Sequence, residues 1–175
     1  FLRKYGNENS ERFRSARNNF IRSLAAYSVV SYILQIKDRH NGNIMIDEEG
    51  HLIHIDFGFI FDWSPGKDMR FESADFKFTQ EFIDILGGNP KAEPYALFVK
   101  RVVQGFLAVR EHATELKTII ELMFYSGYPC FKPVSIQKLN ERFRLDLNPL
   151  EAAAHMRGVI NSAHDRWTTK IYDWI

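Results

Sequence analysis

Three oxygen-bearing side chains lie close together in the first third of the chain, and their types suit phosphoryl transfer. Asp38 precedes Asn43 by five residues, and Asp56 follows 13 residues later. A carboxylate near an attacking hydroxyl can act as a base, while Mg²⁺ on the phosphates takes hard oxygen ligands such as an amide carbonyl and a carboxylate. The sequence therefore predicts that Asp38 faces an acceptor alcohol and that Asn43 and Asp56 bind the metal.

His40 is an alternative base, because an imidazole titrates near neutral pH. The residue types alone leave the choice between Asp38 and His40 open. Taken singly, Asp38 or Asn43 is more typical of a turn with local hydrogen bonds, and only the joint pattern favours chemistry. His54 is expected to pack and hydrogen-bond on a strand rather than to bind a metal.

The pattern around these residues predicts a mostly helical α+β fold with one short β-hairpin that carries the metal ligands. A helix is expected over 11–36, and two short β runs over 43–47 and 51–56 are joined by a turn at Glu48–Gly50. A long irregular loop follows. The rest is expected to be helical, with ranges 80–88, 94–109, 112–125, 136–143, 149–163 and 165–175, and with Thr79, Ser135 and Asn148 as caps. Residues 7–10, which end in a serine, offer cap candidates for the first helix.

Composition limits the classes of protein that fit. Apolar residues make up 45% of the 175 residues, so a core is expected, and a net charge of +1 argues against a dedicated nucleic-acid binder. The single cysteine, Cys130, indicates a reducing compartment and an inert thiol. The most apolar stretch, 20–36, is too short and too polar to span a membrane, so any membrane contact is expected to be peripheral.

Two motifs together resemble those of the phosphoinositide 3-/4-kinase superfamily, which includes related large protein kinases. They are Asp-Arg-His-Asn-Gly-Asn at 38–43 and His-Ile-Asp-Phe-Gly at 54–58. A protein kinase has the order His-Arg-Asp, and here that triplet is reversed while the five-residue separation of base and metal ligand is kept. The resemblance implies the C-terminal lobe of a protein-kinase-like fold over 1–175, with a catalytic loop at 37–43 and an activation segment at 56–78.

The resemblance extends from about residue 15 to 172 and is greatest to type III phosphatidylinositol 4-kinases. Their downstream landmarks match at 76–79, 86–88, 106–110 and 128–131, and the stretch before Pro129 is more similar to the alpha form than to the beta form. The implied activity is transfer of the γ-phosphate of ATP to the 4-hydroxyl of phosphatidylinositol. The implied cofactors are ATP and Mg²⁺, with Mn²⁺ as a substitute.

The resemblance also implies roles for individual residues. Met45 and Ile55 match positions that line the adenine pocket, and both are apolar as an adenine floor requires. Lys67, Arg70 and Lys77 are the basic residues of the activation segment and are expected to contact the lipid headgroup. Because they are few and are offset by acidic neighbours, plain phosphatidylinositol is the expected substrate.

A complete kinase needs a glycine-rich loop and a lysine from an N-terminal strand, and neither precedes Asp38. We therefore expect the chain to be a fragment that is inactive without its N-terminal lobe. The expected partners are that lobe, regulatory subunits and a membrane containing phosphatidylinositol. The resemblance implies a cytoplasmic, peripheral location at the plasma membrane. A C-terminal run with Trp167 and Trp174 either meets the bilayer or packs on the lobe.

Two other functions are compatible with the sequence. One is a phosphoinositide 3-kinase or a related protein kinase, which shares the same motifs. The other belongs to a different class, a catalytically silent lobe that serves as a docking scaffold. The presence of Asp38, Asn43 and Asp56 together argues against the scaffold, because a silent lobe does not need all three.

Overall fold

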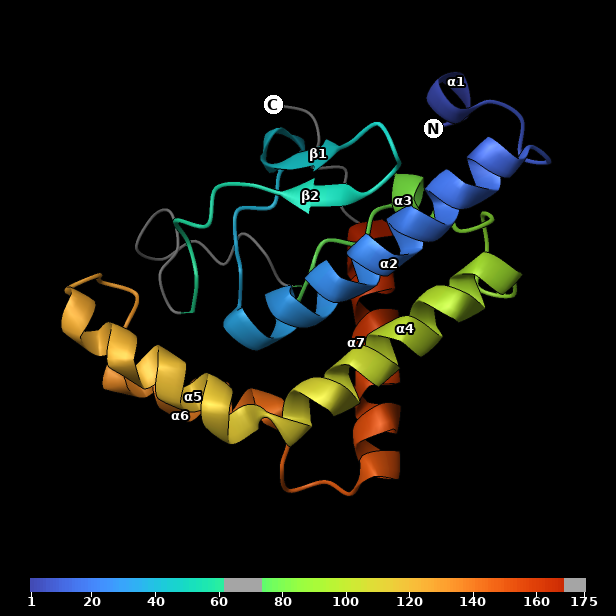
Figure 1. Cartoon of the computed structure of the whole chain (residues 1–175). Coiled ribbons are helices and arrows are strands. Elements are labelled where there is room, and N and C mark those ends of the chain that lie inside the picture. The colour runs from blue at the N-terminus through green and yellow to red at the C-terminus, as the bar shows by residue number, and fades with distance from the viewer. Residues whose placement is uncertain (62–73, 169–175) are drawn as a thin grey trace.

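The computed structural model describes residues 1–61 and 74–168, in which a two-stranded hairpin lies beside a set of packed helices (Figure 1). This arrangement confirms the predicted mostly helical α+β fold. The helices are α1 (Leu2–Tyr5), α2 (Glu11–Leu34), α3 (Gln80–Ile85), α4 (Glu93–Glu111), α5 (Ala113–Leu122), α6 (Pro133–Phe143) and α7 (Pro149–Thr168), with 3₁₀ turns η1 (Asn41–Asn43) and η2 (Met123–Ser126). The strands are β1 (Ile44–Ile46) and β2 (Leu52–His54), which pair antiparallel.

Helix α2 runs through the middle of the structure, and residues 37–43, the predicted catalytic loop, follow its C-terminal end (Figure 1). The side chain of Ser10 caps its start by accepting a hydrogen bond from the N–H of Phe13 at 3.1 Å, as the sequence predicts for a serine before a helix. Its buried face packs on α4, which in turn packs on α7. The core residues contributed by α2 include Phe20, Ile21, Leu24, Val29 and Ile33.

The hairpin docks on α2 through its turn. Gly50 has φ 92°, and a Cβ at this position would lie 2.6 Å from the backbone oxygen of Ala16. Only glycine combines that backbone conformation with so close an approach. The predicted turn at Glu48–Gly50 is therefore also the point where the hairpin touches the long helix.

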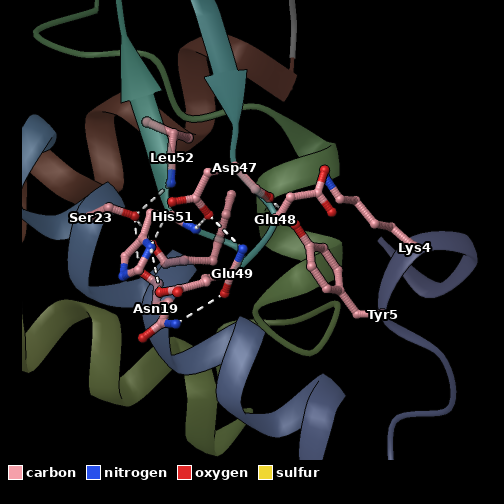
Figure 2. A network of polar contacts seen from close by, with 10 residues as sticks. Lys4, Tyr5, Asn19, Ser23, Asp47, Glu48, Glu49, His51 and Leu52 are labelled. Carbon is pink, nitrogen blue, oxygen red and sulfur yellow. Dashed lines mark hydrogen bonds and ion pairs between the residues drawn. The ribbon is translucent and has the colours of Figure 1, made fainter.

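Polar contacts fix the turn further (Figure 2). The amide of Asn19 donates to the backbone oxygen of Glu49 at 3.0 Å, and the hydroxyl of Ser23 accepts from the N–H of Leu52 at 2.8 Å. The hydroxyl of Tyr5 donates to the backbone oxygen of Asp47 at 2.6 Å, so α1 also holds the turn. The turn between β1 and β2 is consequently held by two helices, α1 and α2.

The helices after residue 79 match the predicted ones except at their ends. Asn148 caps α7 by accepting from the N–H groups of Leu150 and Glu151, and the Glu151 carboxylate accepts from the Asn148 N–H, which confirms the predicted capping box. The prediction that Ser135 caps a helix is wrong, because α6 already begins at Pro133. The Ser135 hydroxyl instead donates to the backbone oxygen of Cys130 at 3.0 Å.

The end of the chain also differs from the prediction. Helix α7 continues to Thr168 rather than ending near residue 163 before a separate last helix. Residues 169–175, and with them the predicted contact of the C-terminal run with a membrane, lie outside the described residues. Within residues 1–61 and 74–168, none of the helices has the length and apolar character needed to cross a bilayer.

Candidate active site

The predicted catalytic loop, residues 37–43, follows the end of α2 and lies beside the segment that follows β2. Gln35 adopts a left-handed conformation at the end of α2, and its N–H bonds the backbone oxygen of Ser31. Two backbone hydrogen bonds then join the two stretches, from Lys37 N–H to the Phe59 oxygen at 2.9 Å and from Phe61 N–H to the Leu34 oxygen at 3.0 Å. The two motifs seen in the sequence are therefore held side by side.

Arg39 connects the two motifs from within the fold. Its side chain is buried, with a relative exposure of 1% for the residue, and its guanidinium donates to the backbone oxygens of Lys37 and Ile55 at 2.8 Å each and to that of Asp56. A buried cation needs such partners, because its desolvation is otherwise very costly. No role was predicted for Arg39, and its position between Asp38 and His40 in the motif is the one sequence signal that indicates it.

Asn43 lies at the end of η1 and is also buried. Its amide nitrogen donates to the backbone oxygen of Asp38 at 2.9 Å, and its own backbone oxygen accepts from the N–H of Ile55 at 3.0 Å. Because the amide nitrogen is used in this way, the amide oxygen is the atom left to bind another group. An available amide oxygen is what a magnesium ligand requires.

Asp38 and Asp56 both adopt left-handed backbone conformations, with φ 61° and 57°. This conformation is uncommon outside glycine, and aspartate is among the residues that tolerate it best. Asp56 stabilises its own turn, because one carboxylate oxygen accepts from the N–H of Gly58 at 3.3 Å. The other carboxylate oxygen of Asp56 is not used in that turn, and Asp56 as a whole is exposed.

His40 is oriented by the loop that it belongs to. Its Nδ1 accepts a hydrogen bond from the N–H of Gly42 at 3.1 Å, and a Cβ on Gly42 would lie 3.0 Å from the His40 ring. The Nε2 atom lies 3.9 Å from a carboxylate oxygen of Asp38. In the neutral ring, Nδ1 is therefore the acceptor and the proton is on Nε2, the atom nearer to Asp38.

The three predicted headgroup residues have different outcomes. Lys67 and Arg70 lie outside the described residues. Lys77 is buried, with an exposed fraction of 3%, and its ammonium group donates to the side-chain oxygen of Asn41 at 2.7 Å. The structure thus gives Lys77 a contact with the catalytic loop, while its predicted contact with a headgroup stays a prediction.

Met45 and Ile55 lie on the outer side of the hairpin. Met45 pairs with Ile53 across the strands, and all three side chains are exposed. The opposite side of β2 is buried through Leu52 and His54. The hairpin therefore presents an apolar outer surface at the predicted adenine positions, beside the two motifs.

His54 packs on a strand as predicted, but the hydrogen bond that was also predicted is not made by its Nδ1 within the described residues. Its ring stacks on that of Tyr27 with centroids 4.2 Å apart, and burial, together with the charges of Arg39 and Lys77, lowers the pKa of His54 to about 4. Its Nδ1 is buried and has no partner among the described residues. A neutral, enclosed imidazole of this kind is suited to packing rather than to proton transfer near pH 7.

The predicted metal ligands flank the hairpin rather than lying within its strands. Asn43 immediately precedes β1, and Asp56 stands two residues beyond the end of β2. Both strands have three residues, which is shorter than predicted, because the chain turns into η1 at one side and into the left-handed Asp56 at the other. Over residues 1–61 and 74–168, no group of three or more histidine, cysteine and acidic residues has a metal-binding arrangement.

Comparisons with known proteins agree with these motifs. The family model described as phosphatidylinositol 3- and 4-kinase matches residues 1–133. Phosphatidylinositol 4-kinase stt4 of Schizosaccharomyces pombe is 48% identical over 174 residues, covering 99% of this chain and 9% of that protein. Phosphatidylinositol 4-kinase beta 1 of Arabidopsis thaliana is 44% identical over 179 residues, covering 99% of this chain and 16% of that protein.

A human protein named putative phosphatidylinositol 4-kinase alpha-like protein P2 is 42% identical over 178 residues. That match covers 100% of this chain and 30% of the human protein. The chain thus spans between about a tenth and a third of the length of these three relatives. Each similarity covers essentially the whole chain, including both motifs.

Proposed function

Since the chain belongs to the phosphatidylinositol 3- and 4-kinase family, we propose that it supplies the catalytic loop of a lipid kinase. The proposed reaction transfers the γ-phosphate of ATP to the 4-hydroxyl of phosphatidylinositol. The observation that carries this proposal is the connection of the two motifs through Arg39 and Asn43, which joins Asp38 to Asp56 by hydrogen bonds. A 4-kinase is favoured over a 3-kinase because the three relatives described above carry that name.

The donor set fits a magnesium ion. Asn43 would hold it through its amide oxygen, and Asp56 would hold it through the carboxylate oxygen that its own turn does not use. Both are hard oxygen ligands, which Mg²⁺ and Mn²⁺ share as a preference. When bound, such an ion neutralises charge on the β- and γ-phosphates of ATP.

The geometry favours Asp38 over His40 as the base. A base needs a free lone pair, and His40 already uses the lone pair of Nδ1 to accept from Gly42. Its Nε2 then carries a proton, so neutral His40 donates toward Asp38 or toward an oxygen of the transferring phosphoryl group. We assign the removal of the inositol hydroxyl proton to the Asp38 carboxylate and a stabilising role to His40.

The remaining parts of the substrate complex follow from the exposed surfaces. The outer side of the hairpin, with Met45 and Ile55, would contact the adenine of ATP. Lys77 is held by Asn41, and the sequence offsets the few basic residues of the activation segment with acidic neighbours. The proposed acceptor is therefore unphosphorylated phosphatidylinositol, met by a peripheral cytoplasmic enzyme at the plasma membrane, with regulatory subunits as further partners.

An assay of the intact protein tests this function. Vesicles with phosphatidylinositol, its monophosphates or a peptide acceptor are incubated with ATP and Mg²⁺, and the product is identified by chromatography of its deacylated form. We expect phosphatidylinositol 4-phosphate. A 3-phosphate product or phosphorylation of the peptide alone would overturn the proposed specificity, and turnover that is unchanged in Asp56→Ala would remove Asp56 from the mechanism.

The roles of Asp38 and His40 are tested in the same assay. Asp38→Asn keeps the shape and the left-handed preference but removes the base, so kcat is expected to fall by about 10²–10⁴-fold. His40→Gln keeps a side-chain donor, so its kcat is expected to fall by no more than about tenfold. Adding Asp38→Asn to that variant should lower kcat as much as it does in the unmodified protein. If His40→Gln lost more activity than Asp38→Asn, the two assignments would have to be exchanged.

A further inference from the structure

A pocket that lies outside the two kinase motifs is formed by the C-terminal end of α2, α6 and α7. Its volume is about 720 Å³, which is within the range of small-molecule sites. Tyr32 and Gln35 line it from α2, Lys138 and Arg142 from α6, and His155 from α7. None of its lining residues belongs to the two kinase motifs, so the proposed reaction does not account for it.

Arg144, His155 and Tyr32 form a row of hydrogen bonds at this pocket, in which each residue donates to the next. A guanidinium only donates, so the contact of 3.3 Å between Arg144 Nη1 and His155 Nδ1 makes Nδ1 the acceptor. In the neutral ring the proton is then on Nε2, which lies 2.9 Å from the Tyr32 hydroxyl oxygen. Burial, and next the charge of Arg144, lower the pKa of His155, which favours this neutral form.

The direction of these bonds leaves a donor at the end of this row. Because the Tyr32 oxygen accepts from His155, the Tyr32 O–H proton is free to be donated to another acceptor. A second donor is close by in sequence, since the side-chain nitrogen of Gln35 is buried and has no partner among the described residues. A buried donor without an acceptor is unfavourable, and this applies to the Gln35 nitrogen. The Tyr32 hydroxyl has His155 as its partner, and both Tyr32 and Gln35 line the pocket.

The lining also contains charged side chains that can donate hydrogen bonds to an anion. The cations Lys138, Arg142 and Arg144 line the pocket together with two carboxylates, Glu141 and Asp146. Asp146 is already bound by Arg144 through two contacts of 3.1 and 3.0 Å, so its charge is largely compensated. Arg142 is likewise paired, with Asp75 beside the pocket at 2.5 Å. The lining therefore combines three cationic side chains, two of them held by carboxylates, with the Tyr32 hydroxyl and the Gln35 amide as donors.

We propose that this pocket binds a small oxyanion of the phosphate-ester class, whose oxygens accept from the Tyr32 hydroxyl and the Gln35 amide. The same chemistry is offered by free inorganic phosphate and by the headgroup of a phosphorylated inositol lipid. The pocket is also connected to residues 37–43 through side-chain contacts. Arg142 pairs with Asp75 at 2.5 Å, and Lys77, two residues after Asp75, bonds Asn41. The site does not depend on the proposed kinase function.

Calorimetric titration of the intact protein tests this site. Inorganic phosphate and glycerophosphoinositol 4-phosphate are the two probes, and a non-hydrolysable ATP analogue with Mg²⁺ saturates the nucleotide site. We expect one saturable binding event. Tyr32→Phe should raise its Kd about tenfold, because one hydrogen bond to a charged ligand is lost while the ring is kept. Gln35→Glu should abolish it by replacing a donor with an anion of the same size.

Two matched variants control for general effects. Tyr125→Phe removes a hydroxyl from an exposed tyrosine, and Gln104→Glu adds a carboxylate to an exposed position of α4, so both should bind as the unmodified protein does. Equal affinity for both probes would identify phosphate itself as the ligand, and preference for the ester would identify the headgroup. The absence of saturable binding by either probe, or an unchanged Kd in Tyr32→Phe, would overturn the proposal.

Discussion

At the scale of single residues, the charged group that organises the active site is not one of those expected to do chemistry. Arg39 is buried and donates to three backbone oxygens, from Lys37 on one motif and from Ile55 and Asp56 on the other. Hydrogen bonds from a charged donor in a buried place are among the stronger ones in proteins. The position of Asp56 therefore depends on a buried side chain that is not among the predicted catalytic and metal-binding residues.

Arg39→Lys is expected to lower stability and activity together. A lysine keeps the charge but not the fork of donors, so at least one of the three backbone oxygens loses its partner, at a cost of about 1–3 kcal/mol in the free energy of unfolding. Denaturant unfolding and the lipid-kinase assay measure both effects. Arg101→Lys, at an exposed position of α4, is the control, and equal behaviour of the two variants would contradict the role of Arg39.

At the scale of elements, the hairpin owes its place to its turn on α2. Gly50→Ala is expected to destabilise the protein by about 2–4 kcal/mol, because it adds backbone strain to a Cβ only 2.6 Å from the Ala16 oxygen. Gly127→Ala has a similar positive φ of 77° but no atom within 4 Å, so it should show the strain alone. Thermal unfolding of the two variants separates strain from overlap, and equal losses would refute the close approach.

His54, on the buried side of β2, also makes the free energy of unfolding depend on pH. The pKa of His54 is about 4 in the fold and ordinarily 6.5, so below about pH 6.5 the unfolded chain binds a proton that the folded chain does not. The contribution of His54 is thus complete above pH 6.5 and is lost as pH falls toward 4, by at most about 3 kcal/mol. His54→Phe keeps a ring against Tyr27 and removes the titration.

Urea unfolding between pH 4 and 7 measures that difference. The slope of stability against pH should be shallower for His54→Phe than for the unmodified protein. His112→Gln, at an exposed position between α4 and α5, should leave the slope as it is. A slope that His54→Phe does not change would mean that His54 titrates alike in the folded and unfolded chains.

At the scale of the whole molecule, local signals predicted the elements better than the contacts between them. The serine before α2 and the asparagine before α7 cap as expected, because a cap depends on residues within one turn. The cap predicted at Ser135 is wrong because proline is also favoured at the first position of a helix, and α6 begins earlier, at Pro133. The partners of Arg39 and Lys77 lie between 2 and 36 residues away, so no spacing rule indicated them.

The contacts of Arg110 are also long-range and join α4 to the end of α6 and the connection to α7. Arg110, near the end of α4, donates to the backbone oxygens of Phe143, Arg144 and Leu147 at 2.9, 2.8 and 2.6 Å. These oxygens lie at the end of α6 and in the connection to α7, where the last carbonyls of a helix have no partner within it. One guanidinium thereby holds three helices in place.

Arg110→Met is expected to lower the free energy of unfolding by about 2–4 kcal/mol, because the methionine keeps most of the apolar stem but leaves three oxygens without their donor. Arg157→Met, at an exposed position of α7, removes the same charge and should cost less than about 0.5 kcal/mol. Denaturant unfolding gives both values. Because Arg110 touches neither motif, the variant should keep its kcat below the unfolding transition, and a fall in kcat without a fall in stability would place Arg110 in the active site instead.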